Sequence, residues 1–155
     1  MNDRYLYRAK RCDNGEWVEG HLFDDGFENG RIFVGGLVIE EYHGTACDDW
    51  SITGIDFYEV DQSTICQCTG LKDKNGKLIW ENDILHNGNY FIVKWNVPCA
   101  RFDIVLNNSH NIPIGKWEPM ICDWKTNDFK EYRKTVDYEV IGNIFDNAEL
   151  LESEG

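Results

Sequence analysis

The sequence lacks a long apolar run, a signal-like N-terminus and a Cys-x-x-Cys pair. No apolar run approaches the ~20 residues that a membrane-spanning helix needs. The first residues, MNDRYLYRAKRC, contain no apolar signal core, so we expect a cytoplasmic protein. In that compartment the six cysteines are expected to be reduced thiols and not disulfides.

Basic residues are also scarce, because 15 Lys and Arg stand against 28 Asp and Glu and leave a net charge of −13. The imbalance is concentrated in residues 21–63, where Arg31 is the only base, and in residues 137–155, which have no base. Such a surface repels the phosphates of nucleic acids. It either keeps the protein soluble or offers an acidic face to a basic partner, including a DNA-binding protein that recognises a mimic of DNA.

What the sequence does contain fits a globular protein. The chain has 155 residues, of which 42% are hydrophobic and 14% aromatic, so it can bury a core. We expect residues 1–155 to form one compact unit. Because the charge shifts sharply near residue 63, the chain could also divide into an N-terminal lobe, residues 1–63, and a C-terminal barrel, residues 64–155.

Short apolar and aromatic runs between turn residues predict a mainly β fold with little helix. Residues 4–23 are expected to form a hairpin that turns at residues 13–15, and Gly35-Gly36 to bend or bulge a strand over 31–42. Further strands are expected over residues 51–60, 90–95, 101–106 and 138–145, and loops over 43–50 and 107–113. At most a short helix is expected after Pro119 within residues 117–134. A second short helix is expected over residues 148–151, capped by Asp146 or Asn147.

The chain is organised around residues 65–85, ICQCTGLKDKNGKLIWENDIL. Asn75-Gly76 predicts a tight turn, because both residues tolerate a positive φ. Asp73 and three nearby lysines fit a solvated turn tip, Gly70 indicates a bend, and Asn82-Asp83 is a second turn candidate. Such short strands and forced turns favour a compact SH3-like or related small β-barrel with extra N-terminal strands.

The segment from Thr69 to Ile84, Thr-Gly-Leu-x-Asp-Lys-Asn-Gly-Lys-x-Ile-x-Glu-x-Asp-Ile, resembles the hallmark of the YopX family of bacteriophage and prophage proteins. Residues 7–20, the Val-Lys-Trp at 93–95, and residues 139–145 followed by Leu150-Leu151 agree with it. The resemblance implies a phage-related, homo-oligomeric protein of unestablished biochemical role, and it supplies no catalytic residues.

This sequence departs from the family pattern in two places. Asn82 stands where Gly is expected, and Asn can replace Gly at positive φ, so the turn is expected to survive. Cys66 and Cys68 stand where other residues are expected, which argues against these thiols being a family feature.

A metal site could be assembled from Cys66 and Cys68, which would share one face of a strand, with Cys47 or Cys99 and one of the four histidines. Structural zinc usually has tighter paired spacing, so we interpret these cysteines as small buried hydrophobic residues. We expect no metal and no cofactor.

Other candidate sites rest on acidic residues. Glu81 and Asp83 could form a carboxylate pair beside His86, and Asp48-Asp49 could gather with His43 and Cys47 in a loop. Two segments resemble known ligand-binding loops but do not match the residue pattern that those loops require. Residues 70–77 differ from a phosphate loop by one extra residue between the glycines and by Leu78 in place of Ser or Thr, and residues 73–76 lack the later ligands of a calcium loop.

We therefore predict a non-enzymatic, self-associating protein-binding module, with no assigned catalytic, cofactor or metal residues. We expect a second copy as its partner, with a host or phage protein as a further candidate, and neither nucleic acid nor a membrane as a partner. Two alternatives remain open. One is a small hydrolase or nucleotide-processing enzyme that uses the acidic turn residues, and the other is a nucleic-acid-binding barrel that stacks bases on its aromatic side chains.

Overall fold

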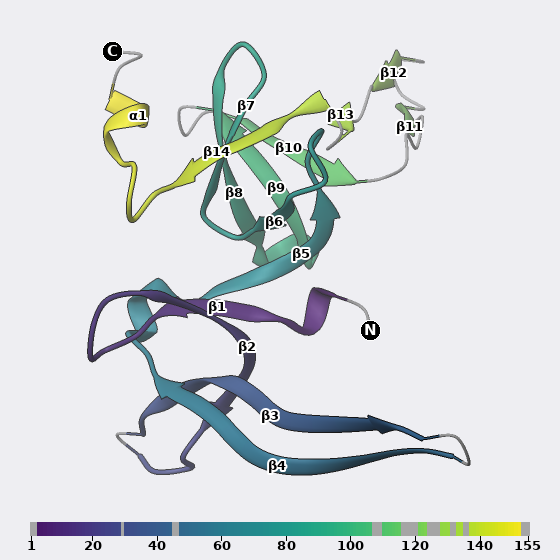
Figure 1. Cartoon of the computed structure of the whole chain (residues 1–155). Helices are drawn as coiled ribbons and strands as arrows, with labels where there is room; N and C mark the ends of the chain where they lie inside the picture. Colours follow the sequence, from purple (N-terminus) through teal and green to yellow (C-terminus); the bar gives the residue numbers. More distant parts are fainter. Residues whose placement is uncertain are drawn as a thin grey trace. The chain divides into compact units, whose positions relative to one another are not determined.

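The structure, a computed structural model, describes residues 3–28, 30–44, 47–106, 110–115, 121–123, 128–130, 133–134 and 137–152 (Figure 1). It is mainly β, with 60% strand and 11% helix, which confirms the predicted class. The chain divides into two compact units, Tyr5–Gln67, here the N-terminal unit, and Met1–Arg4 with Cys68–Gly155, here the C-terminal unit. None of the helices in these ranges has the length and apolar character that a membrane crossing requires.

The N-terminal unit is a meander of antiparallel strands in the order β4-β3-β2-β1-β5. Its strands are β1 (Tyr7–Lys10), β2 (Trp17–Asp24), β3 (Ile32–His43), β4 (Asp48–Glu59) and the start of β5 (Cys66–Lys72), with the 3-10 turn η2 (Gln62–Thr64) before β5. Ala9, Val34 and Val60 form its small buried core. The predicted hairpin over residues 4–23 is confirmed, because β1 pairs with β2 and Gly15 turns at φ +73°.

Two predictions in this unit were wrong. Residues 43–50 are mostly not a loop, because β3 extends to His43 and pairs with Asp48 of β4. Gly35-Gly36 does not form the bulge, since the register shifts between Val38 and Ile39. Gly35 instead allows β4 to come close: a Cβ there would lie 1.9 Å from the carbonyl oxygen of Asp56.

The C-terminal unit contains a sheet in the order β13-β10-β9-β8-β7-β14, together with the β5–β6 pair and the β11–β12 pair. Its remaining elements are β6 (Leu78–Trp80), β7 (Asp83–His86), β8 (Tyr90–Asn96), η3 (Val97–Cys99), β9 (Arg101–Leu106), β10 (His110–Gly115), β11 (Ile121–Asp123), β12 (Asp128–Lys130), β13 (Arg133–Lys134), β14 (Glu139–Asn143) and α1 (Glu149–Glu152), and η1 (Asp3–Tyr5) precedes β1. Its core consists of Ile79, Leu85, Phe91, Val93, Ile104, Tyr138 and Val140.

The predicted barrel is not formed by the strands that the structure describes. Closure would require the outermost strands of the order, β13 and β14, to pair with each other, and they do not. One local prediction was also wrong: β10 begins at residue 110, inside the loop expected over residues 107–113. The short helix allowed after Pro119 falls mostly outside the described residues, and within them residues 121–123 form β11, which pairs with β12.

The turns of the central stretch are as predicted. Gly70, Gly76 and Asn82 have φ of +74°, +82° and +65°, and the β5–β6 register shifts between Cys68 and Lys72 around Gly70.

The predicted C-terminal helix is present as α1. The side chain of Asn147 does not cap it, because it accepts a hydrogen bond from the N–H of Asn143 at 3.3 Å, on the side away from the helix.

Candidate functional site

Asp73, at the start of the central turn, is buried, and so the expected solvated tip is wrong for this residue. Its Oδ1 accepts hydrogen bonds from the N–H groups of Asn75 and Lys77 at 2.8 and 2.9 Å, and its Oδ2 accepts one from the N–H of Val140 at 3.0 Å. The last bond joins the turn to β14, 67 residues further along the chain. Asp73 is therefore a structural group whose two oxygens are already used by the backbone.

The second turn uses its acid in the same way. Asp83 is buried, and its Oδ2 accepts a hydrogen bond from the N–H of Trp80 at 2.8 Å. Asp83 and His86 are three residues apart on β7, so their side chains leave opposite faces of the strand. The structure therefore does not assemble the predicted group of Glu81, Asp83 and His86, and the ring of His86 lies instead against Tyr90.

The second acidic cluster, around residues 43–49, is also not assembled. Tyr42 pairs with Asp49 and His43 with Asp48 in the β3–β4 ladder, so successive side chains alternate between the two faces. His43 lies 3.8 Å from Glu41, and Asp49 accepts a hydrogen bond from the N–H of its neighbour Trp50 at 2.8 Å. These are local surface interactions with no shared centre.

The cysteines do not form the predicted alternative metal site. Cys66 and Cys68 are fully buried, as expected of small apolar residues, and Cys47 and Cys99 are exposed. In the described part of the chain no group of three or more His, Cys, Asp or Glu side chains could hold a metal ion.

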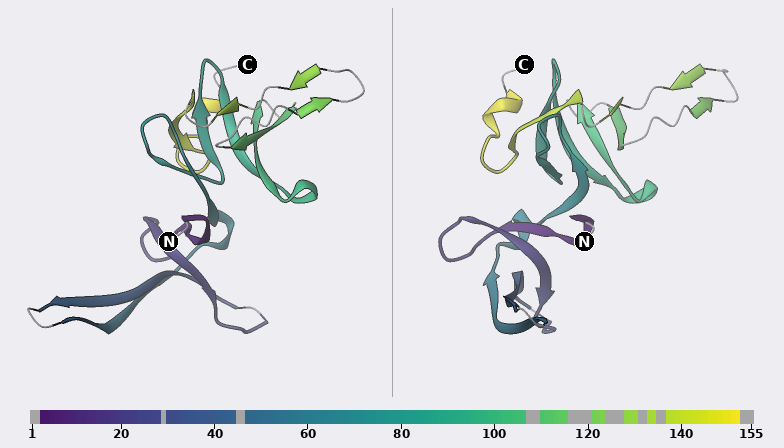
Figure 2. Two further views of the ribbon diagram at one scale, coloured as in Figure 1. Left: turned by 90° about the vertical axis from the view of Figure 1, so that its right-hand side faces the viewer. Right: turned by 45° about the vertical axis from the view of Figure 1, so that its right-hand side comes forward.

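The feature that distinguishes this structure is the arm, residues 36–56, in which β3 and β4 run together beyond the end of β2. The last β2–β3 pair towards the arm is His21 with Gly35, whereas the β3–β4 ladder continues to His43 and Asp48. Figure 1 and the left view of Figure 2 show the two strands side by side along this length. Because a two-stranded ribbon has no further layer here, its side chains remain in solvent.

One face of the arm, the apolar face, consists of large hydrophobic side chains. Opposite residues of an antiparallel ladder share a face, and the pairs Leu37–Ile55, Ile39–Ile52 and Glu41–Trp50 follow one another along it. The five apolar residues of these pairs are between 51% and 71% exposed. Phe23, Phe33 and Phe57 continue the face at the base of the arm, where the rings of Phe23 and Phe57 meet edge to face at 4.6 Å.

The bulge decides which residues share this face. Ile52 and Ile55 are three positions apart, so a regular strand would place them on opposite faces. Thr53 is the extra residue between the pairs Val38–Gly54 and Ile39–Ile52, and it brings Ile52 onto the same face as Ile55. Its hydroxyl donates to the carbonyl oxygen of Val38 at 3.3 Å, which fixes the bulge against β3.

The other face of the arm, the acidic face, includes Glu40, Asp49 and Asp56. A shallow hollow of about 120 Å³ lies along it, lined in part by Glu40, Tyr42 and Ser51. The arm therefore presents mainly large apolar side chains, with Glu41, on one side, and carboxylates, with the exposed Val38 and Tyr42, on the other.

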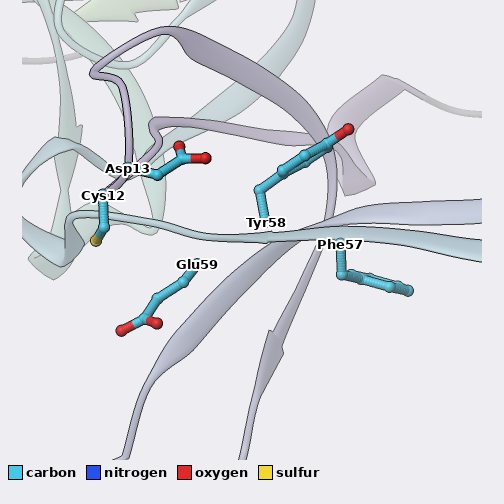
Figure 3. A pocket seen from close by; sticks show the side chains of 5 residues that line it. All are labelled: Cys12, Asp13, Phe57, Tyr58 and Glu59. Atoms are coloured by element: carbon cyan, nitrogen blue, oxygen red, sulfur yellow. The ribbon is translucent and has the colours of Figure 1, made fainter.

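A larger hollow, of about 310 Å³, lies at the base of β4 and is lined by Cys12, Asp13, Phe57, Tyr58 and Glu59 (Figure 3). Arg11 hydrogen bonds to Asp13, which lowers the pKa of that carboxyl group, and its guanidinium lies 3.8 Å from the centre of the Tyr58 ring. Burial, followed by the charges of Glu59, Asp61 and Asp13, raises the pKa of the Cys12 thiol. A raised pKa reduces the thiolate, so the surroundings of Cys12 are the opposite of those that activate a nucleophilic cysteine.

The sequence predicts the two strands of the arm and its acidity, but not the exposed apolar face. The signal that was available is the composition of residues 37–41, where three apolar residues are followed directly by two glutamates. A strand buried on one face alternates, so this pattern fits a ribbon that is buried on neither face.

Comparison with known proteins supports the resemblance noted in the sequence. A search of curated proteins found no match. The family model described as YopX protein matches residues 6–152, which is nearly the whole chain and includes the central turns, the arm and β14. The chain therefore belongs to the YopX protein family.

Proposed function

We propose that this chain is a non-enzymatic protein-binding module that self-associates through the apolar face of its arm and serves a bacteriophage or prophage as an accessory protein. The observation that supports this proposal is the row of exposed hydrophobic side chains on one face of the arm. The exposed thiols of Cys12, Cys47 and Cys99 suit a reducing compartment such as the host cytoplasm.

The size of the face fits this role. At half to two-thirds exposure each of these side chains leaves on the order of 100 Å² in solvent, so the face is at or above the largest patch of a typical monomer, about 300–600 Å². Two such faces in contact would bury on the order of 1,000 Å², near the lower end of stable interfaces. A second copy can therefore cover the face.

Charge opposes this association but does not prevent it. Each subunit carries −13, and salt screens that repulsion over about 8–10 Å. Glu40, Asp49 and Asp56 lie on the acidic face, so packing through the apolar face does not bring these three carboxylates into contact, and Glu41, opposite Trp50, is the carboxylate of the arm's apolar pairs that it brings towards the partner. We therefore expect the oligomer to be as stable, or more stable, at moderate salt than at low salt.

Sedimentation equilibrium at tens of micromolar, at low and moderate salt, tests the proposal. We expect a discrete oligomer of the wild type and its loss in the double variant Ile52→Thr/Ile55→Thr. The matched control is Val38→Thr/Tyr42→Thr, which removes exposed apolar groups from the opposite face and should leave the oligomer intact. A monomeric wild type under both conditions would refute self-association.

A further inference from the structure

The outer edge of β4 is a second surface, distinct from the apolar face. β4 is the last strand in the sheet order, with β3 as its neighbour along its length. It has 12 residues, whereas an ordinary strand has about five or six. At its C-terminal end the N–H of Cys12 donates to the carbonyl oxygen of Glu59 at 2.9 Å. The edge before that point presents backbone donors and acceptors to which another strand can pair.

The side chains along this edge are mainly apolar on one face and include two acids on the other. Trp50, Ile52 and Ile55 point to the apolar face, and Asp49 and Asp56 point to the acidic face. The hydroxyl of Tyr58 hydrogen bonds to Asp56, which raises the pKa of Tyr58. A strand added here would have one face against apolar side chains and the other against carboxylates.

A second copy of β4 is a poor occupant of the edge. Two antiparallel copies related by a two-fold axis between Ile52 and Thr53 would bring Asp49 of each strand opposite Asp56 of the other. Like charges in cross-strand positions destabilise a sheet. An anionic membrane surface is disfavoured for the same reason. The charge of the edge instead fits a strand that carries Lys or Arg.

We propose that the β4 edge binds an extended segment of a partner protein in which apolar residues alternate with Lys or Arg. This inference rests on the proposed role of the arm as a binding element, and it names the partner's chemistry. The apolar residues of the segment extend the apolar face, the basic residues meet Asp49 and Asp56, and the backbone continues the sheet.

The hollow at the base of β4 lies where such a segment would end. Figure 3 shows the side chains of Phe57 and Glu59 on one side of β4 and that of Tyr58 on the other. The hollow has a volume of about 310 Å³, and its lining includes Glu59 and Asp13, of which Asp13 is already paired with Arg11. Its size and the carboxylate of Glu59 suit one long basic side chain at the end of the added strand.

The test is fluorescence anisotropy with a labelled peptide of about nine residues in which Val and Lys alternate. We expect a Kd on the order of 10–100 μM, and at least about tenfold weaker binding of a peptide with the same residues in two blocks. A third peptide, N-methylated at alternate backbone nitrogens, keeps charge and order but cannot pair as a strand, and it should not bind. Equal binding of all three, or no binding of the first, would overturn the inference.

Protein variants locate the site. Asp49→Asn/Asp56→Asn should weaken binding of the alternating peptide by about tenfold, because both carboxylates adjoin the edge. Glu19→Gln/Glu28→Gln removes the same charge from exposed positions on β2 and the following loop, and should have little effect. Equal weakening by both pairs would mean that net charge alone attracts the peptide.

The two proposals can fail separately. A wild-type monomer that binds the alternating peptide would refute self-association and leave the edge inference standing. An oligomer that is lost in Ile52→Thr/Ile55→Thr but does not bind the peptide would refute the edge inference alone.

Discussion

Two hairpins of this protein place their acidic and apolar side chains in opposite environments. In the turn between β5 and β6, Asp73 is 4% exposed and accepts three backbone hydrogen bonds, and Ile79 beside it is fully buried. In the arm between β3 and β4, Asp49 and Glu40 are exposed, and Trp50 is 64% exposed. Ile79 of the first hairpin shares its core with Val140 of β14, whereas the side chains of the arm's apolar face are more than half exposed.

This difference separates what supports the fold from what can bind. The central segment, Thr69 to Ile84, carries the resemblance to the YopX family, and its polar groups are largely used within the chain: Thr69 donates to the carbonyl oxygen of Ile79 at 2.7 Å, and Asp73 and Asp83 hold their turns. Side chains that are already satisfied in this way have little capacity for a ligand. The arm has apolar side chains and strand-edge groups that another protein can satisfy.

The largest effect is expected when the central acid is removed. Asp73→Ala leaves the N–H groups of Asn75, Lys77 and Val140 without their acceptor, the last of them in the core, and should lower the free energy of unfolding by about 3–5 kcal/mol. Urea titration measures this. Lys74→Ala, which removes the exposed ion pair with Glu139, is the control and should cost less than about 1 kcal/mol. If Asp73→Ala and Lys74→Ala lowered the free energy of unfolding by similar amounts, the proposed difference between buried and exposed polar groups would be wrong.

The same carboxylate predicts how stability depends on pH. Burial alone would raise the pKa of Asp73, but hydrogen bonds from the backbone of Val140, Lys77 and Asn75 hold it below the usual value. Because the folded pKa is depressed, ionised Asp73 stabilises the fold above the unfolded pKa of about 3.9, and this contribution is lost as pH falls through the folded pKa. Wild type should therefore lose stability in acid more steeply than Asp73→Asn. Parallel curves of unfolding free energy against pH would contradict the assignment.

A smaller effect is expected at the tip of the same turn. Gly76 has φ +82°, and a Cβ there would meet no atom within 4 Å, so the cost of a side chain comes from the backbone conformation alone. Gly76→Val should destabilise by about 1–3 kcal/mol, and Gly76→Asn by less, because Asn tolerates positive φ. Denaturant midpoints give both values, and equal midpoints would show that the turn does not constrain the fold.

The sequence was most informative where the geometry is local. Positive φ at Gly70, Gly76 and Asn82 was predictable because few residues tolerate it, and the strands at 90–95 and 101–106 follow from short apolar runs. The depth of Asp73 was not predictable, since its third hydrogen bond comes from Val140, which is far away in the chain. The failure of the barrel has the same origin, because closure depends on which distant strands pair.

The exposed apolar face of the arm could not be predicted from the sequence, although its strands could. A strand was predicted over residues 31–42 and β3 spans Ile32–His43, but a strand pattern does not indicate how many neighbouring strands it pairs with. The apolar face depends on the ladder running past β2 and on a one-residue bulge at Thr53 that brings Ile52 and Ile55 together. Neither the length of the β3–β4 ladder nor the position of the bulge can be predicted from the local pattern of residue types.

The smallest effect on stability is expected in the arm itself. Ile52 and Ile55 are 53% and 71% exposed, so Ile52→Thr/Ile55→Thr removes little buried surface and should change the free energy of unfolding by no more than about 0.5–1 kcal/mol. Ile104→Thr, at a fully buried position of the other unit, should cost about 2–4 kcal/mol, because it leaves a cavity and buries a hydroxyl group. Both are measured by urea titration at low protein concentration, where dilution removes the stabilisation that self-association adds. If the arm variant were as destabilising as the core variant in the dilute monomer, the apolar face would be part of the fold and not a surface for another protein.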